Sequence, residues 1–166
     1  YSVTTGAPSH IYRLPNVFGK WCKPNYNSFV ATFCRNVIDQ NPINLDNDRT
    51  IELLYVDELI KQIHHHLNSD SWGIINSFNT ISIKISDVLG KLENFKNLYF
   101  KEGIVPNLNS TFDLNLFNTF RSYIPLDHFP NSQVKHTDTR GYFAEIIRSS
   151  SEGQVSISTS SPSVER

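Results

Sequence analysis

Methionine is absent from this chain of 166 residues, and cysteine, charge and long apolar runs are scarce. A chain that begins at Tyr1 and holds no methionine is expected to be a piece of a longer product. The two cysteines, Cys22 and Cys34, are too few for a disulfide scaffold and favour a reduced, cytoplasmic protein. No apolar run reaches the roughly 18 residues of a membrane span and no signal peptide opens the chain, so we expect no membrane insertion. The net charge of −1 argues against a nucleic-acid partner.

Two motifs of nucleotide-dependent enzymes are also missing. The chain contains no Gly-x-Gly-x-x-Gly, so no dinucleotide phosphate loop is visible. None of the seven tyrosines is followed four residues later by a lysine, which excludes the Tyr/Lys acid pair of short-chain oxidoreductases. We therefore assign no catalytic residue and no metal ligand to this chain, and we expect it to be inactive on its own.

A predicted strand and the asparagine after it supply the first candidate for a binding site. His10 to Leu14 predicts a short strand, which Pro15 stops because proline cannot donate to a sheet ladder. Asn16 would then lie at the carboxyl end of the strand, and Gly19 marks a sharp turn. Open α/β sheets bind ligands outside the carboxyl ends of their strands, so Asn16 is well placed to contact one.

The loop that follows supplies the other candidates of this stretch. Lys20 and Lys23 lie in a polar, turn-rich segment, and Asn27 and Ser28 are good N-cap types before an apolar-periodic run. The free N–H groups of a helix start, with lysines on the approach loop, suit a phosphate. An ordinary strand, loop and helix with nothing bound accounts for the same residues equally well.

Helical and strand patterns alternate along the first 125 residues. The predicted helices are 28–40, 57–67, 84–95 and 110–123. The predicted strands are 43–45, 51–56 and 72–78. Asp57 is a plausible N-cap of the second helix, and Ser110 with Asp113 has the spacing of a capping box. The buried stripe of the last helix is predicted to be Phe112, Leu116 and Phe120, with Phe117 beside it.

The pattern changes after Pro125, which stops the last helix. Residues 126–133 look like a connector, and 142–148 and 154–159 are successive strand candidates joined by a serine-rich turn. A change from alternating helices and strands to strands alone indicates a domain boundary.

Two clusters of polar residues have a competing functional and structural interpretation. His64, His66 and Asp70 mimic the spacing of metal ligands, but residues two apart on a helix point about 200° apart, so a partly solvated helix face is favoured. Asp138 and Arg140 fit a turn into a strand, although such a pair could also serve an anionic substrate.

Several motifs together resemble known families. Arg13-Leu14-Pro15-Asn16-Val17-Phe18-Gly19 resembles the Arg-x-x-Asn-Val-[Phe/Tyr]-Gly stretch of extended short-chain dehydrogenases/reductases that act on nucleotide sugars. Leu54-Tyr55-Val56-Asp57-Glu58-Leu59 is similar to the Val-Asp-Asp region of that family. Residues 135–146, beginning Lys135-His136-Thr137-Asp138-Thr139-Arg140-Gly141, are similar to the start of a cupin domain. A reductase followed directly by a cupin is the arrangement of the bifunctional enzymes of capsular polysaccharide synthesis in the UDP-N-acetyl-L-fucosamine pathway. The segments 116–125 and 153–158 also resemble their interdomain helix and an early cupin strand.

The resemblance implies an α/β fold in three parts. Residues 1–125 would be the C-terminal, substrate-binding part of an NAD(P)-binding, Rossmann-like reductase domain, 126–133 a linker, and 134–166 the first β-strands of a cupin jelly roll. The whole enzyme would use NADPH to reduce the C4 keto group of a UDP-linked 4-keto-6-deoxy-N-acetylhexosamine. Its cupin, with a zinc ion held by histidines beyond Arg166, would handle epimerisation at C3. The resemblance also implies a homodimer, whereas this chain by itself is expected to bind neither cofactor tightly.

Arg49 is a further candidate for substrate binding, but it departs from the family pattern. Many extended reductases carry an arginine two residues nearer the Val-Asp motif, where Ile51 stands here. Two alternatives remain open at this point. The chain could be a non-catalytic sugar-nucleotide-binding or interaction module, or part of another NAD-dependent nucleotide-sugar 4-epimerase or dehydratase.

Overall fold

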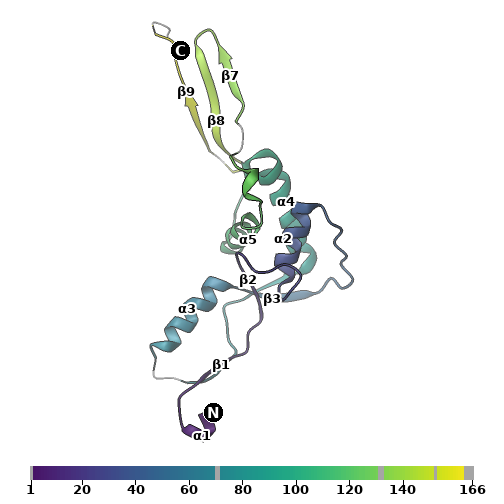
Figure 1. Ribbon diagram of the computed structural model, residues 1–166, viewed down its shortest axis with the longest axis vertical. Coiled ribbons are helices and arrows are strands. Elements are labelled where there is room, and N and C mark those ends of the chain that lie inside the picture. Colours follow the sequence, from purple (N-terminus) through teal and green to yellow (C-terminus); the bar gives the residue numbers. More distant parts are fainter. Residues whose placement is uncertain (1, 70–71, 131–132, 152, 163–166) are drawn as a thin grey trace.

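The computed structural model of the protein describes residues 2–69, 72–130, 133–151 and 153–162. Asp70, the linker residues Asn131 and Ser132, and the chain end from residue 163 therefore lie outside the described residues. Figure 1 shows a long molecule with the short helix α1 (Ser2–Thr5) at one end and a narrow β-sheet at the other. Helices and a second small sheet lie between these ends.

The strand predicted over His10 to Leu14 is shorter than expected, because the chain changes its pairing partner at Pro15. Strand β1 (His10–Tyr12) pairs in parallel with β4 (Gly73–Ile75). After the proline, β2 (Asn16–Phe18) pairs in parallel with a different strand. Asn16 is thus the first residue of a strand and does not follow the carboxyl end of one, which corrects the prediction.

The three-stranded sheet β2-β3-β5 forms the base of the main core. β3 (Thr50–Tyr55) confirms the predicted strand, pairs in parallel with β2 and runs antiparallel to β5 (Ile81–Lys84). β5 was not predicted, since a four-residue strand leading directly into a helix carries little pattern of its own. The segment predicted as a brief strand at 43–45 forms none: Ile43 instead packs against the core from a loop.

Three helices pack against this sheet, and two of them begin as predicted. Ser28 caps α2 (Phe29–Asp39) by accepting a hydrogen bond from Ala31 N at 3.4 Å. Ser110 caps α5 (Thr111–Arg121) by accepting one from Asp113 N at 3.1 Å. The third helix is α4 (Ile85–Phe95), which a π-helical segment, Lys96–Lys101, continues. The predicted stripe of α5 is confirmed as part of the core, which includes Phe18, Leu53, Val88, Leu92, Phe112, Leu116, Phe117 and Phe120.

The N-cap predicted at Asp57 is wrong. α3 (Val56–Leu67) begins one residue earlier, with Tyr55 at the N-cap position and no side-chain cap. The reason is that β3 runs into α3 without a turn, so Asp57 already lies in the first helical turn. A carboxylate there still interacts favourably with the helix dipole.

The C-terminal sheet contains the two predicted C-terminal strands and two strands that were not predicted. β8 (Gly141–Ser149) is central and pairs antiparallel with β7 (Lys135–Asp138) and β9 (Gln154–Ser158). The two-residue strand β6 (Ile104–Val105) joins β8 in parallel at Arg148 and Ser149. Between them, Leu126–His128 forms one turn of 3-10 helix within the predicted connector. No helix in the described part of the chain is long and apolar enough to cross a membrane.

Candidate functional site

A cavity of about 430 Å³ lies where β2 and β3 end beside the first turn of α5. We call it the strand-end cavity. Its walls combine three aromatic rings with hydroxyl and amide groups, from Phe18, Leu53, Tyr55, Glu58, Asn79, Thr80, Ile81, Ser110, Thr111, Phe112 and Asn115. The ring centroid of Phe18 lies 5.3 Å from that of Tyr55 and 5.7 Å from that of Phe112. Apolar walls with a few polar groups are the usual lining of a small-molecule site.

Asn16 lies on the sheet face that bears this cavity. It pairs directly with Leu53, which pairs on its other side with Ile81, and directly paired residues point to the same face. The Asn16 side chain is exposed, and its Nδ2 donates a hydrogen bond of 3.4 Å to the backbone oxygen of Glu52. Asn16 does not line the cavity itself. The predicted residue is therefore beside the cavity, held by a contact at the long limit of hydrogen bonding.

Two titratable groups at or near the cavity have a shifted pKa. Burial, and to a lesser extent the charge of Asp57, raises the pKa of Tyr55, so its phenol remains a neutral hydrogen-bonding group. Glu52, on the opposite face of β3, has its pKa lowered by hydrogen bonds from the hydroxyls of Thr80 and Ser82. Tyr55 thus gives the cavity lining a neutral phenol, whereas Glu52 does not line the cavity and accepts a hydrogen bond from Thr80, which does.

Gly19 follows β2 for a steric reason that the sequence did not reveal. A Cβ at this position would overlap the side chain of Val56, the first residue of α3. The close approach keeps the end of β2 against the start of α3. It therefore fixes the point at which the loop after Gly19 leaves the sheet.

The loop Lys20–Asn27 runs from the end of β2 to α2 and carries the predicted lysines. The Nζ atom of Lys20 lies 5.9 Å from the ring centroid of Trp21, and that of Lys23 lies 6.0 Å from the ring centroid of Tyr26. Both lysines are near their aromatic neighbours, and neither lines the strand-end cavity. Their loop instead contacts the C-terminal end of α5, because Trp21 N donates to Ser122 Oγ at 3.3 Å.

Asn27 and Ser28 lie at the start of α2 as predicted, and Ser28 has a clear structural role. Its side chain caps the helix, and its backbone oxygen accepts from Thr32 N and Thr32 Oγ1 at 3.2 and 3.1 Å. Ser28 is also buried, with 7% of its surface exposed, whereas Asn27 is exposed. Neither side chain lines the strand-end cavity.

Arg49 precedes β3 and stands apart from the other candidates. Its backbone oxygen accepts from Ile85 N at 3.2 Å, next to a cap that the sequence did not reveal. Asp48 accepts hydrogen bonds from the N and Oγ of Ser86, at 2.9 and 2.8 Å, and so caps α4 from a distant segment. The segment around Arg49 therefore fastens α4 to the sheet.

The three histidines of α3 are placed on different sides of the helix. His64 and His65 are exposed, whereas His66 is half-buried, stacks on His10 with 5.7 Å between ring centroids, and lies 3.1 Å from Tyr12 Oη through its Nδ1. No group of three or more metal-ligating side chains occurs among the residues that the structure describes. The turn predicted at Asp138 is confirmed: Asp138 Oδ1 accepts from Arg140 N at 2.8 Å, and the two side chains form an ion pair.

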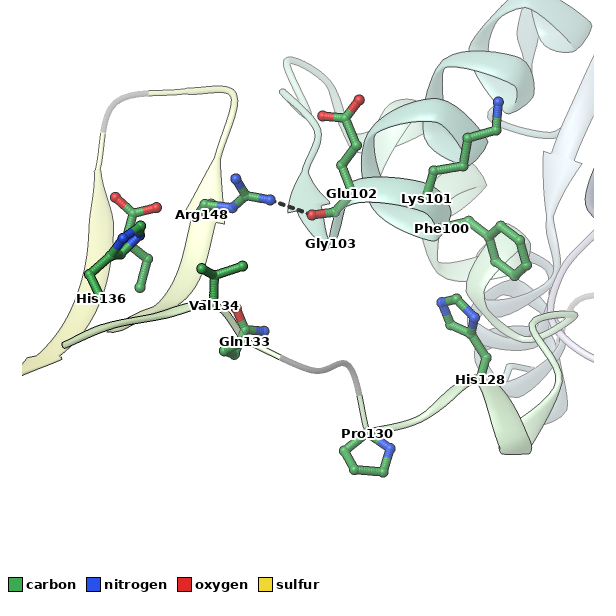
Figure 2. Close-up of a pocket in the computed structure, with 11 residues that line it drawn as sticks. Phe100, Lys101, Glu102, Gly103, His128, Pro130, Gln133, Val134, His136 and Arg148 are labelled. Atoms are coloured by element: carbon green, nitrogen blue, oxygen red, sulfur yellow. Dashed lines mark hydrogen bonds between the residues drawn. The ribbon is translucent and has the colours of Figure 1, made fainter. Parts of the chain in front are cut away.

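A second cavity, of about 500 Å³, lies where the C-terminal sheet meets the helical part of the chain. Figure 2 shows Phe100 and His128 on one wall and Arg148, Val134 and His136 on the other. Arg148 Nη2 donates to the backbone oxygen of Glu102 at 2.5 Å, and the His128 ring stacks on Phe100 with 4.3 Å between centroids. None of the predicted site residues lines this cavity, which is formed by the contacts that join the two regions.

None of the residues that line the strand-end cavity was predicted as a site residue. Phe18 and Tyr55 stand inside the two reductase-like motifs, but they were interpreted as parts of those motifs and not as pocket walls. A usable signal existed, since each ends a strand and ligands gather at such ends. Phe112 and Thr80 come from distant segments, and no local pattern places them beside Phe18.

Comparisons with known proteins agree on what the chain resembles. It is 34% identical over 164 residues to the UDP-2-acetamido-2,6-beta-L-arabino-hexul-4-ose reductase of Pseudomonas aeruginosa, which covers 97% of this chain and 44% of that protein. The crystal structure of the capsular polysaccharide assembling protein CapF from Staphylococcus aureus matches with a TM-score of 0.84 and 32% identity, over 99% of this chain and 45% of that chain. No family model matches the sequence.

A more distant structure shares the fold over part of the chain. The UDP-N-acetylglucosamine 4-epimerase of Methanobrevibacter ruminantium matches with a TM-score of 0.60 and 18% identity, over 74% of this chain and 48% of that chain. At this identity the likeness concerns the fold alone. The resemblance that the motifs indicated is confirmed by the other two proteins: over nearly its whole length, this chain is related to CapF and to the hexul-4-ose reductase, and it spans less than half of each.

Proposed function

We propose that this chain is part of an NADPH-dependent nucleotide-sugar reductase/epimerase of capsular polysaccharide biosynthesis. Its partner would be a UDP-linked 4-keto-6-deoxy-N-acetylhexosamine. The observation that carries the proposal is the 34% identity to a UDP-hexul-4-ose reductase along almost the entire chain, combined with the CapF fold. Cys22 and Cys34 are both free thiols, which supports the cytoplasmic setting expected of such an enzyme.

The proposal assigns each region of the chain to a different part of the whole enzyme. Residues 1–125 would be the substrate-binding part of the reductase, 126–133 the linker and 134–166 the first strands of a cupin. The different coverage of the relatives supports this division. CapF matches 99% of the chain, whereas a 4-epimerase matches 74% of it, as expected if epimerases share one region only.

The chain's own residues would hold the sugar nucleotide and not transform it. Asn16 would contact the sugar or the cofactor edge through its amide, beside the strand-end cavity that would take the sugar ring. Lys20, Lys23 and the N–H groups that open α2 would face the diphosphate, because cations and a helix start both favour an anion. Arg49 is given no contact in this proposal, because it does not line the cavity and its backbone borders the cap of α4.

Neither cofactor fits the residues that the structure describes. NADPH would supply a hydride in the whole enzyme, but this chain lacks the glycine-rich loop and the Tyr/Lys pair. Zinc would act as a Lewis acid in a complete cupin, but the described residues contain no cluster able to hold a metal ion. We therefore expect the 166-residue chain to bind UDP-sugars without oxidising NADPH, and turnover above a heat-killed control would contradict this.

The experiment that tests the function uses the coding sequence extended on both sides to the length of the relatives. We expect its product to oxidise NADPH with a UDP-4-keto-6-deoxy-N-acetylhexosamine. Asn16→Ala should raise KM or lower kcat with little change in Tm, because losing the hydrogen bond of its amide to the sugar or the cofactor edge costs about 0.5–1.5 kcal/mol, roughly twofold to tenfold. Asn44→Ala, at an exposed loop asparagine, is the matched control. An unchanged kcat/KM with a clearly lower Tm would show that Asn16 is structural.

A further inference from the structure

The loop Lys20–Asn27 exposes two large aromatic rings to solvent. Trp21 is 80% exposed and Tyr26 is 74% exposed, although tryptophan is among the residues that proteins bury most on average. Each ring has a lysine ammonium group about 6 Å from its centroid, which is within the range of a cation–π contact. Two aromatic–lysine pairs on one eight-residue loop form a surface that the fold itself does not use.

The backbone of this loop is held at several points while the rings remain outside. Trp21 N donates to Ser122 Oγ, and Tyr123 Oη donates to the backbone oxygen of Cys22 at 2.6 Å. Further along, Asn25 N donates to Thr32 Oγ1 at 2.9 Å. Trp21 and Asn25 have φ angles of 60° and 54°, a left-handed conformation that asparagine adopts readily but that costs energy at Trp21 and persists there only where the surroundings enforce it.

The charge around the loop favours an anionic ligand. The first 38 residues contain Arg13, Lys20, Lys23 and Arg35 and no aspartate or glutamate. The two lysines of the loop therefore have no acidic neighbour in their own stretch of chain. An exposed aromatic face beside cations is the combination by which proteins bind nucleotides, since the base stacks on the ring and the phosphates meet the cations.

We propose that Trp21 stacks on the base of the sugar nucleotide, with Lys20 and Lys23 facing its diphosphate. This inference rests on the proposed function and adds a residue that determines specificity for the nucleotide half of the substrate. The hydrogen bonds of the loop with Ser122, Tyr123 and Thr32 pre-order it. Little conformational entropy is then lost when the base docks, which is what a pre-organised site gains in affinity.

The chain offers a direct reporter, because Trp21 and Trp72 are its two tryptophans. Trp72→Phe leaves Trp21 as the sole indole, and Trp21→Phe is the matched variant in which Trp72 alone reports. We expect UDP to quench the fluorescence of the Trp72→Phe chain in a saturable way and to leave the Trp21→Phe chain unchanged. Inorganic pyrophosphate should compete with UDP without quenching, since it has no base. Calorimetry of Trp21→Leu should show UDP binding roughly five- to hundredfold weaker, with Trp72→Leu unaffected.

Three results would overturn the inference. Saturating UDP that leaves Trp21 fluorescence unchanged excludes stacking. Equal quenching in the two single-tryptophan variants shows that the effect is not at Trp21. A concentration-dependent increase in mass that Trp21→Leu abolishes, without UDP dependence, shows that the loop contacts a second copy of the chain. The extended protein separates this failure from that of the proposed function: NADPH oxidation with an unchanged KM for the UDP-sugar in Trp21→Leu removes the role of Trp21 and leaves the reductase activity in place.

Discussion

The helical body, which consists of β2, β3, β5 and the helices packed on them, buries far more apolar side chains than the C-terminal sheet does. Almost all fully buried apolar side chains belong to β2, β3 and the helices α2, α4 and α5. In the described part of the sheet β7-β8-β9, Ala144 is the one buried apolar residue, and Ile146, Ile147, Val155 and Ile157 are between 41% and 54% exposed. Figure 1 shows this sheet projecting from the body with no layer packed on its faces. Strand pairing alone gives a sheet little independent stability, because a packed apolar face is needed as well.

Hydrogen exchange should reveal the largest difference between the two regions. Amides of α2 and β3 are expected to exchange only through opening reactions that approach global unfolding, whereas amides of β9 open locally at low cost. We expect protection in 29–67 to exceed that in 142–158 by at least about a hundredfold. Mass spectrometry of peptides from both regions measures this. Equal or reversed protection would contradict the comparison, because it would show that the sheet is stable although its apolar side chains are exposed.

Truncating one side chain in each region tests the same contrast by stability. Phe120 is fully buried and lies 6.0 Å from Phe95 between ring centroids, so Phe120→Ala should cost about 3–5 kcal/mol in urea-induced unfolding. Ile157 is 46% exposed on β9, and Ile157→Ala should change the free energy of unfolding by less than about 1 kcal/mol. A loss at Ile157 as large as that at Phe120 would contradict the comparison.

The ion pairs of the two regions should also differ in how much they contribute to stability. Lys91 Nζ lies 2.7 Å from Asp113 Oδ1, and the Asp113 side chain is 12% exposed and also accepts from Ser110 Oγ. Asp113→Asn is expected to cost about 1–3 kcal/mol, because charged hydrogen bonds are lost at a largely buried site. Asp138→Asn, at the exposed pair with Arg140 in the sheet, should have no measurable effect on thermal unfolding.

Asp113 should also make the stability of the helical body depend on pH in the acid range. Burial raises the pKa of Asp113, but hydrogen bonds from Lys91 and Ser110 outweigh it, and the pKa lies below its ordinary value. A depressed pKa contributes stability above the unfolded-state pKa of about 3.9, and this is lost as the pH falls through the folded-state pKa. Asp113→Asn should therefore flatten the loss of stability below about pH 4. If Asp113→Asn loses stability below about pH 4 as the unmodified protein does, other carboxylates cause that loss.

The smallest expected effect concerns a single hydroxyl in each region. Tyr123 Oη donates to the backbone oxygen of Cys22, and Tyr123→Phe should lower the free energy of unfolding by about 1 kcal/mol. The matched change in the sheet is Tyr142→Phe, which should leave stability unchanged. Differential scanning calorimetry can resolve the two. If Tyr142→Phe costs as much as Tyr123→Phe, the sheet is more tightly packed than the exposure of its side chains indicates.

Much of the body could be predicted because its helices carry strong local signals. Phe112, Leu116 and Phe120 recur at helical spacing, and Ser28 and Ser110 precede such runs with the side chains that cap helices. The short strands were less predictable. A strand was predicted over 72–78, and β4 confirms it over three residues only. β5 and β6 were not predicted, because two to four residues are too few for a period of two to stand out. The break at Pro15 was located correctly, but the change of partner from β4 to β3 depends on segments far along the chain.

The sequence by itself determined the helices, the caps at Ser28 and Ser110, the change of pattern after Pro125 and the relationship to nucleotide-sugar enzymes, since each rests on neighbouring residues or on motifs. Only the tertiary structure decided where the candidate residues meet. It placed Asn16 inside a strand beside the cavity, separated Arg49 from it, and brought Thr80 and Phe112 to Phe18. It also fixed the loop of Trp21 against α5, more than 100 residues along the chain. The reason is physical: periodicity and capping act over a few residues, whereas a binding site is formed by pairing and packing between distant segments.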